Sequence, residues 1–178
     1  GTGMESHALH GDGIYHEAGD KLWVNLYAPS TAHWEAAGVR VEMTTDFPVG
    51  ESVKLVVREG GPKEWTLALR RPWWAGDGFA VKVNGEPVAV PPLPADAKPA
   101  AGTYVELRRT WKPGDAVEVV LPKRLHLEPI PDNPQRAAIL WGPLVLVGAV
   151  AEPGGREGRR GKLQDLRAIP VLVAAGRP

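Results

Sequence analysis

The sequence contains no cysteine. This absence excludes disulfides, thiolate zinc sites and a cysteine nucleophile from the chain itself. There is also no excess of charge of either sign, because Lys plus Arg and Asp plus Glu number 21 each. A nucleic-acid-binding surface needs a basic stripe that displaces counterions, so we expect no nucleic-acid partner.

Long hydrophobic runs are absent as well. The longest, from Ile139 to Val150, is interrupted by Gly142 and Pro143 and is shorter than the roughly 20 residues that cross a bilayer. We therefore expect a soluble chain with no membrane partner. The first residues do not combine a charged region with an apolar one, so the sequence leaves the localisation open.

Glycine, proline and tryptophan are abundant, at 21, 18 and 7 residues. This mixture is typical of short strands joined by tight turns. Apolar residues that alternate along the chain predict strands with one buried face. The predicted core faces are Leu22/Val24/Leu26, Val39/Val41/Met43, Val53/Leu55/Val57 and Trp65/Leu67/Leu69. In the first of these strands, Trp23 and Tyr27 would point outward.

A hairpin is predicted where Asn84-Gly85 separates two apolar runs, because these residues accept the positive φ angles of a type I′ turn. Further strands are expected at 103–110, 116–121 and 124–128, with a turn at 112–115 and an exposed loop at 91–102. About eight short strands at this spacing predict an all-β fold, an antiparallel and jelly-roll-like β-sandwich.

The two ends of the chain differ from this middle part. Thr2 and Glu5 match a capping box, which predicts a short helix that frays before Tyr15, since Gly11 and Gly13 are poor helix formers. A Pro-rich stretch at 129–134 precedes a strand pair around Gly142-Pro143 and a last strand at 169–174. We divide the chain into residues 1–16, 17–128 and 129–178.

Catalytic motifs such as a phosphate loop, a nucleophile elbow or a zinc-binding His/Glu pattern do not occur in the sequence. The candidate carboxylate pairs are Asp46 with Glu51 and Glu106 with Glu118. They fall at turns or on outward strand positions, so we interpret them as solvated surface rather than a glycosidase pair. His7, His10 and His16 lack the spacing that places two imidazoles on one helical face, so we predict no metal site.

Three tryptophans are candidate contacts for a carbohydrate or for a neighbouring domain: Trp73, Trp74 and Trp34. Trp73 and Trp74 follow a strand end in a turn, where two adjacent rings cannot easily both point inward. At least one should therefore lie at the surface. Exposed aromatic rings stack on sugars, and large flat side chains also favour packing between domains.

Six segments resemble one family when they are taken in order. They are residues 1–7 (GTGMESH), 22–30 (LWVNLYAPS), 69–75 (LRRPWWA), 83–87 (VNGEP), 109–115 (RTWKPGD) and 140–146 (LWGPLVL). Together they are similar to the region after the catalytic barrel in the glycoside hydrolase family 127 and 146 group, the β-L-arabinofuranosidase-like proteins long labelled DUF1680. One departure is Trp73, where the family more commonly has serine, and this leaves its role open.

The resemblance implies an (α/α)₆ barrel upstream, a zinc ion held by Cys and Glu, and a Cys nucleophile that retains configuration through a thioglycosyl intermediate. Family members carry a Cys-Cys pair just before Gly-Thr-Gly, whereas this chain begins at that motif and has no Cys. We therefore expect no catalytic residue, metal ligand or cofactor on this chain, and zinc in the parent protein. Glu5 and His7 would stand near the working end of the barrel in that parent.

Residues 1–16 would then be the terminal helix of the barrel, 17–128 the middle β-sandwich, and 129–178 the truncated beginning of a second one. Our leading hypothesis is a non-catalytic β-sandwich that braces its own catalytic barrel and forms an oligomer interface such as a homodimer. The alternative is a carbohydrate-binding module that contacts arabinose-containing glycans through exposed tryptophans.

Overall fold

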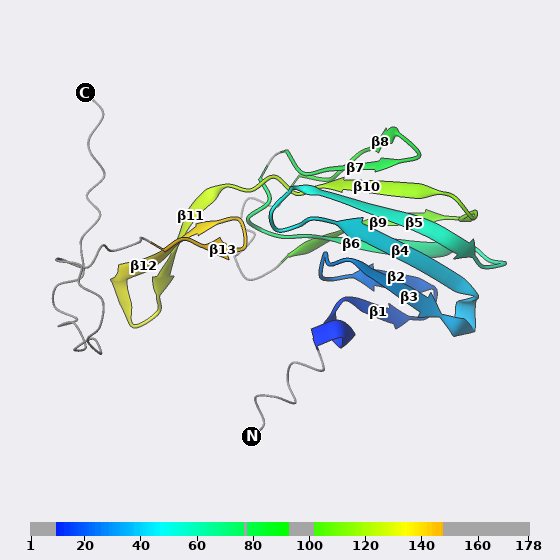
Figure 1. Ribbon diagram of the computed structural model, residues 1–178, viewed down its shortest axis with the longest axis horizontal. Helices are drawn as coiled ribbons and strands as arrows, with labels where there is room; N and C mark the ends of the chain where they lie inside the picture. The colour runs from blue at the N-terminus through cyan, green and yellow to red at the C-terminus, as the bar shows by residue number, and fades with distance from the viewer. Residues whose placement is uncertain (1–9, 77, 93–101, 148–178) are drawn as a thin grey trace, which may run out of the picture. The chain divides into compact units, whose positions relative to one another are not determined.

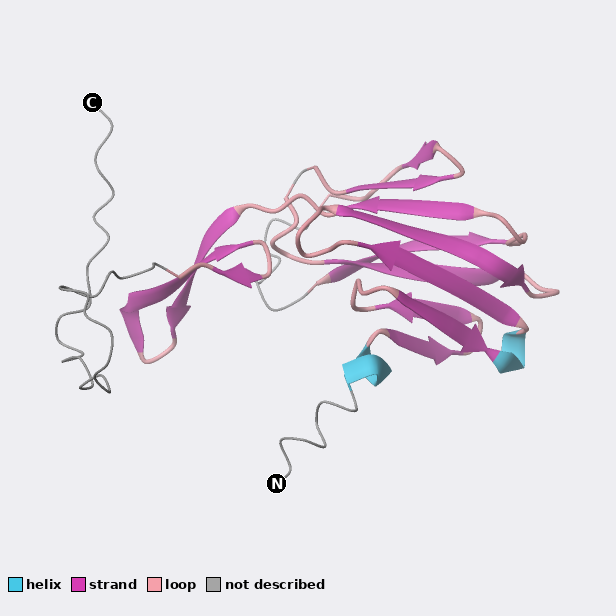
Figure 2. Cartoon of the chain, in the orientation of Figure 1, coloured by secondary structure: helices cyan, strands magenta, loops and turns pink. Residues whose placement is uncertain are grey.

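The computed structural model describes residues 10–76, 78–92 and 102–147, and nearly every regular element in it is a β-strand (Figures 1 and 2). Two short 3₁₀ helices are present in this part of the chain, η1 (His10–Gly13) and η2 (Glu35–Ala37). The strands are β1 (Tyr15–Ala18), β2 (Lys21–Val24), β3 (Ser30–Trp34), β4 (Val39–Thr45), β5 (Ser52–Gly60), β6 (Trp65–Arg71), β7 (Ala80–Val83), β8 (Glu86–Val88), β9 (Thr103–Arg109), β10 (Ala116–Val120), β11 (Leu125–Ile130), β12 (Asn133–Trp141) and β13 (Leu144–Val145).

The strands form three sheets. Sheet A has the order β1-β2-β6-β9, sheet B the order β3-β4-β5-β10-β7-β8, and sheet C the order β11-β12-β13. The strand pairs are antiparallel except for β2 and β6, which run parallel with Lys21 opposite Thr66 and Val24 opposite Leu69. The predicted all-β sandwich fold is confirmed.

The core lies between the inner faces of sheets A and B. Every residue of three predicted core faces is buried: Val39/Val41/Met43, Val53/Leu55/Val57 and Trp65/Leu67/Leu69. Sheet A adds Val105 and Leu107, and sheet B adds Val117 and Val119. Burial of this apolar surface is the main favourable contribution to folding, at about 25 cal/mol per Å².

The first predicted strand is wrong at its C-terminal end. Leu22 and Val24 are buried as expected, but β2 stops at Val24, and Leu26 is 45% exposed. Tyr27 points inward instead, with 7% of its surface exposed, and its hydroxyl donates a 2.6 Å hydrogen bond to the carbonyl oxygen of Arg70. The alternation fails because the chain leaves the strand geometry after Val24, so the inward and outward positions no longer follow a period of two.

Both predicted tight turns are confirmed. β7 and β8 pair as a hairpin in which Val83 lies opposite Glu86, and the two turn residues have positive φ, 53° at Asn84 and 86° at Gly85. The turn between β9 and β10 closes with a 3.0 Å hydrogen bond from the Asp115 N–H to the Lys112 carbonyl. In both turns the residue types permit backbone conformations that most side chains disfavour.

Two strands are additional to those expected from the sequence. β1 pairs with β2 so that Tyr15 lies opposite Val24, and β3 pairs with β4 so that Trp34 lies opposite Val39. Residues 10–13 form a single 3₁₀ turn, and Tyr15 and His16 lie in β1 rather than at the end of a helix. The rest of the predicted helix, most of the 91–102 loop and the last strand at 169–174 fall outside the described residues.

Sheet C begins inside the segment that the sequence assigns to the middle sandwich. β11 runs across the predicted boundary between residues 128 and 129 and pairs with β12, with Leu127 opposite Ile139. The proposed division at that point stays a prediction. Within the described ranges, no helix has the length and apolar character to cross a membrane.

Candidate functional site

Trp73 and Trp74 follow the end of β6 and are both half-buried, each against a different neighbour. The Trp74 ring stacks on Phe47, with 5.9 Å between the ring centroids and 6° between the planes. The Trp73 ring meets the edge of His126 at 4.5 Å and 75°. Trp74 thus packs on the sandwich core, whereas Trp73 contacts the first strand of sheet C.

Trp34, the third candidate, ends β3 and has only 6% of its surface exposed. Its ring meets Trp65 edge to face, with centroids 6.0 Å apart and planes at 86°. Too little of this ring is exposed for a sugar to stack on its whole face. Glu5 and His7, the residues expected near the barrel, lie outside the described residues, so that expectation stays a prediction.

A junction of basic side chains joins β11 to the end of the sandwich. The Lys123 ammonium donates hydrogen bonds of 2.8 and 2.7 Å to the carbonyl oxygens of Pro48 and Val49. The guanidinium of Arg124 lies 5.9 Å from the Trp73 ring centroid and donates to the Trp73 carbonyl at 3.4 Å. Hydrogen bonds from charged donors are stronger than neutral ones, so these contacts fix where β11 leaves the sandwich.

The turn between β12 and β13 is packed on the same junction. The Gly142 N–H donates a 3.0 Å hydrogen bond to the Arg124 carbonyl. Gly142 has φ of 58°, and a Cβ atom there would lie 2.6 Å from the Lys123 side chain. Only glycine therefore satisfies both the backbone conformation and the close approach at this position.

The residues that the strand register places on one face of sheet C are apolar. Cross-strand partners share a face, which places Leu125 and Leu127 of β11 with Trp141 and Ile139 of β12, and Leu144 of β13 beside Trp141. Leu125 and Leu127 are 62% and 64% exposed. We call these five residues the apolar face of sheet C. Contiguous exposed apolar surface of this kind marks an interaction site.

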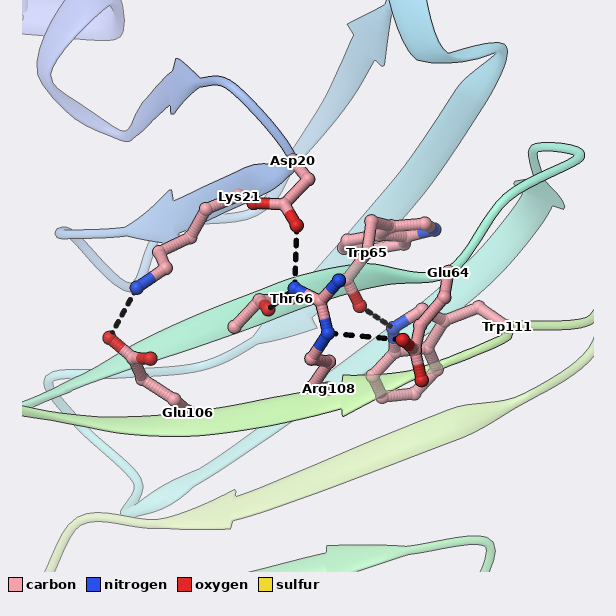
Figure 3. Close-up of polar contacts among 8 residues, drawn as sticks. All are labelled: Asp20, Lys21, Glu64, Trp65, Thr66, Glu106, Arg108 and Trp111. Carbon is pink, nitrogen blue, oxygen red and sulfur yellow. Dashed lines mark hydrogen bonds and ion pairs between the residues drawn. The ribbon is translucent and has the colours of Figure 1, made fainter.

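A second cluster lies on the outer face of sheet A, where charged side chains cover the buried residues of β6 (Figure 3). The Arg108 guanidinium bridges two carboxylates, with hydrogen bonds of 2.5 Å to Asp20 and 3.0 Å to Glu64. Lys21 bonds Glu106 at 2.7 Å. Thr66 lies opposite both Lys21 and Arg108 in the sheet register and is 3% exposed.

The hydrogen bond and charge of Arg108 lower the pKa of the Asp20 carboxyl below its ordinary value. The same pair raises the pKa of Arg108, first through the hydrogen bond to Asp20. Sequence reasoning missed this cluster because its members are far apart along the chain. The alternation of charged and apolar residues in β9 is the only local signal of it.

The carboxylates that we considered for a glycosidase pair have structural neighbours in the fold. Glu51 accepts a 2.9 Å hydrogen bond from the backbone N–H of Lys123, and Glu106 is paired with Lys21. Glu118 lies on β10 opposite Lys54 and Lys82 of the adjacent strands. The positions of Glu106 and Glu118 fit roles in cross-strand charge pairing.

Comparison with solved structures finds glycoside hydrolases. A GH127 β-L-arabinofuranosidase from Geobacillus stearothermophilus T6 aligns with a TM-score of 0.61 and 30% identity, over 76% of this chain and 21% of that one. A second glycoside hydrolase aligns at 0.60 and 30% identity, over 74% and 22%. A GH127 β-arabinofuranosidase aligns at 0.57 and 24% identity, over 74% and 23%, which supports the fold alone.

The chain thus spans only 21–23% of the length of these structures. Comparison with curated proteins finds no match. The family described as the middle domain of GH127 β-L-arabinofuranosidases matches residues 21–123, which contain β2 to β10 of the sandwich. Because this match covers more than half of the sequence, the chain belongs to the GH127 β-L-arabinofuranosidase middle-domain family.

Proposed function

We propose that this β-sandwich is a non-catalytic domain of a larger β-L-arabinofuranosidase-like glycoside hydrolase and that it braces the catalytic barrel of that protein. The family match to a middle domain supports this role, as does the small share of the solved relatives that the chain spans. The parent activity, its arabinose-containing substrates and any homodimer belong to the same proposal.

The apolar face of sheet C is the observation that carries the proposal. Burying an exposed leucine contributes about 1.5–3 kcal/mol, so a sheet with five apolar residues on one face is costly to leave in water. The junction at Lys123 and Arg124 fixes this sheet to the sandwich. A domain that presents a rigid apolar face is suited to packing against another part of the same enzyme.

The Cys nucleophile that the family resemblance implies is absent from this sequence, and the implied zinc does not fit the residues that the structure describes. The sequence has no Cys, and the described residues contain no group of three His, Asp or Glu side chains placed to hold a metal ion. We therefore assign any zinc, and the nucleophile with it, to the barrel of the parent protein. This sandwich contributes packing rather than a reacting group.

An activity measurement tests the non-catalytic part of the proposal. The purified chain should not hydrolyse an aryl β-L-arabinofuranoside above the buffer rate, with or without added zinc. Turnover that follows the chain through purification would overturn this assignment.

Two matched lysine substitutions test the bracing role. Leu127→Lys places a charge on the apolar face, and Ala138→Lys places the same charge at an exposed position on the opposite face of sheet C. In the longer enzyme, Leu127→Lys should lower the thermal midpoint by several degrees, since 1 kcal/mol corresponds to about 2–4 °C in a large domain. Both substitutions should leave the isolated chain nearly unchanged. Equal effects of the two in the longer enzyme would contradict a covered apolar face.

A further inference from the structure

A pocket of about 460 Å³ opens at one end of the sandwich, where the β1–β2 turn, η2 and the β5–β6 loop meet. Its volume falls in the range of small-molecule sites, which is about 300–1,000 Å³. The polar residues of its lining are Asp20, Lys63 and Glu64, and the aromatic ones are Trp34 and Trp65. None of these residues is used by the bracing role proposed above.

Two glycines allow the segments that form the walls of the pocket to approach each other closely. Gly61 has φ of 72°, and a Cβ atom there would lie 2.4 Å from the Ala37 carbonyl oxygen, so the β5–β6 loop reaches η2 only because this residue is glycine. Gly38 ends η2 in a left-handed conformation, and its N–H donates to the Glu35 carbonyl at 3.1 Å. The walls are therefore formed before any ligand binds.

The floor is aromatic and fixed by hydrogen bonds. The Trp65 Nε1–H donates to the Gly60 carbonyl at 2.8 Å, and Trp34 stands edge to face on the Trp65 ring. Trp111 packs below, 5.5 Å from Trp65, and its Nε1–H donates to the Trp65 carbonyl at 3.2 Å. Only small parts of Trp34 and Trp65 reach the pocket, because these residues are 6% and 3% exposed.

The rim is polar and balanced in charge. Asp20 and Glu64 are held by Arg108, and about half of each carboxylate side chain remains exposed, at 56% and 50%. Lys63 adds a second cation beside these two anions. Such a rim has no net charge to attract an ion, but its carboxylate oxygens accept hydrogen bonds and its ammonium donates them. This combination matches a neutral ligand with several hydroxyl groups.

We propose that this pocket binds a neutral mono- or disaccharide. Its hydroxyl groups donate to the free oxygens of Asp20 and Glu64 and accept from Lys63, while its apolar C–H face lies toward the exposed atoms of Trp34 and Trp65. Carbohydrate binding at the end of the sandwich goes beyond the bracing role and does not depend on it.

The test uses the indole N–H signals of the full 178-residue chain in ¹H–¹⁵N correlation spectra, titrated with L-arabinose, an arabinose disaccharide and, as an ionic probe, glucuronate. The neutral sugars should shift the Trp34 and Trp65 signals with a dissociation constant on the order of 1 mM, typical of a weak site. The Trp73 and Trp74 signals should stay in place. Glucuronate should bind more weakly than the neutral sugars.

Isosteric substitutions locate the site. Glu64→Gln and Asp20→Asn should each weaken binding about tenfold, the factor that 1.4 kcal/mol gives. Glu106→Gln is the matched control, because Glu106 lies on the same sheet but does not line the pocket. Thermal unfolding of each variant confirms that the fold is retained. The proposal is overturned by saturating sugar that leaves Trp34 and Trp65 unmoved, by shifts at Trp73 and Trp74 instead, or by equal affinity in all three variants.

Discussion

The Nζ atom of Lys123 donates a 2.7 Å hydrogen bond to the carbonyl oxygen of Val49. The same ammonium bonds the Pro48 carbonyl at 2.8 Å, and the backbone N–H of Lys123 bonds the Glu51 carboxylate at 2.9 Å. One residue just before β11 therefore holds the loop between β4 and β5. The ammonium also donates to the Gly50 carbonyl at 3.4 Å, and these three carbonyl groups would otherwise repel each other.

Removing this ammonium should destabilise the protein. Lys123→Met keeps the apolar stem that packs under Gly142 and removes the charged donor. Because the side chain is partly exposed, we expect a loss of about 1–2 kcal/mol in the free energy of unfolding, at the lower end of values for charged hydrogen bonds. Urea titration measures it. Lys54→Met, at an exposed position of β5, is the control, and a loss of similar size there would contradict this role.

Gly60→Ala should be strongly destabilising. A Cβ atom at Gly60 would lie 2.0 Å from the carbonyl oxygen of Trp111, a backbone atom that cannot turn away. We expect a loss of about 1–3 kcal/mol, as for overpacked interiors. Gly11→Ala provides the comparison, since a Cβ atom at Gly11 would have nothing within 4 Å. Chemical denaturation of both variants tests the prediction, which fails if the two substitutions cost the same.

The ion pair of Asp20 with Arg108 should make stability depend on acid pH. The hydrogen bond and charge of Arg108 lower the Asp20 pKa in the folded state, so the unfolded chain binds this proton more tightly. The contribution is therefore complete above the ordinary Asp pKa of about 3.9 and is lost as the pH falls below it. Asp20→Asn should flatten the acid side of the stability curve.

The dependence on added salt distinguishes a loss of the Asp20–Arg108 ion pair from a change in packing. Both side chains are more than half exposed, so the Asp20–Arg108 contribution should shrink as ionic strength rises. Asp132→Asn, at an exposed position in the turn between β11 and β12, is the matched control that removes a carboxylate outside this ion pair. An Asp20→Asn variant with the wild-type slope at low salt would refute the assignment.

Tyr27 should stabilise the fold at neutral pH and destabilise it at high pH. Burial raises the pKa of its hydroxyl far above the ordinary value. The stability that this shift represents is present below about pH 10, the ordinary tyrosine pKa, and is lost as the pH rises beyond it. Tyr27→Phe should cost about 1 kcal/mol at neutral pH, because the bond to the Arg70 carbonyl is lost.

Spectrophotometric titration at alkaline pH provides the measurement. Tyr27 should ionise only together with unfolding, whereas the unfolding of Tyr27→Phe should depend less steeply on pH. Tyr104→Phe is the control, because Tyr104 is 38% exposed and its hydroxyl bonds the Asn25 side chain at the surface. A Tyr27 signal that titrates before the fold is lost would contradict the prediction.

The sandwich could be predicted because its strands alternate strictly. Val53, Leu55 and Val57 share a face in any strand, and Asn84-Gly85 allows few turns other than the one observed. The alternation misleads where a strand ends early, as it does before Leu26 and Tyr27. Sequence periodicity carries no information on where a strand ceases to be paired, because that depends on the neighbouring strand.

The candidate site was harder to predict for a related reason. Trp73 and Trp74 were found from their place after a strand, but nothing in the sequence around Trp34 shows that it packs against Trp65, a residue of another strand. The partners of Arg108 lie in two other segments of the chain, so no local pattern contains the cluster. Contacts of this kind follow from strand order, which the sequence of one element does not encode.

The parallel pairing of β2 with β6 requires a long crossover of the chain. Between these two strands the chain leaves sheet A and passes through β3, β4 and β5 of sheet B. Between β6 and β9 the chain leaves sheet A again and passes through β7 and β8 of sheet B. Each return closes a long loop, whose entropic cost falls once the intervening hairpins are in place. Because β3, β4 and β5 pair in sequence order and β7 pairs with β8, we expect these locally connected strands to form before β6 and β9 join sheet A.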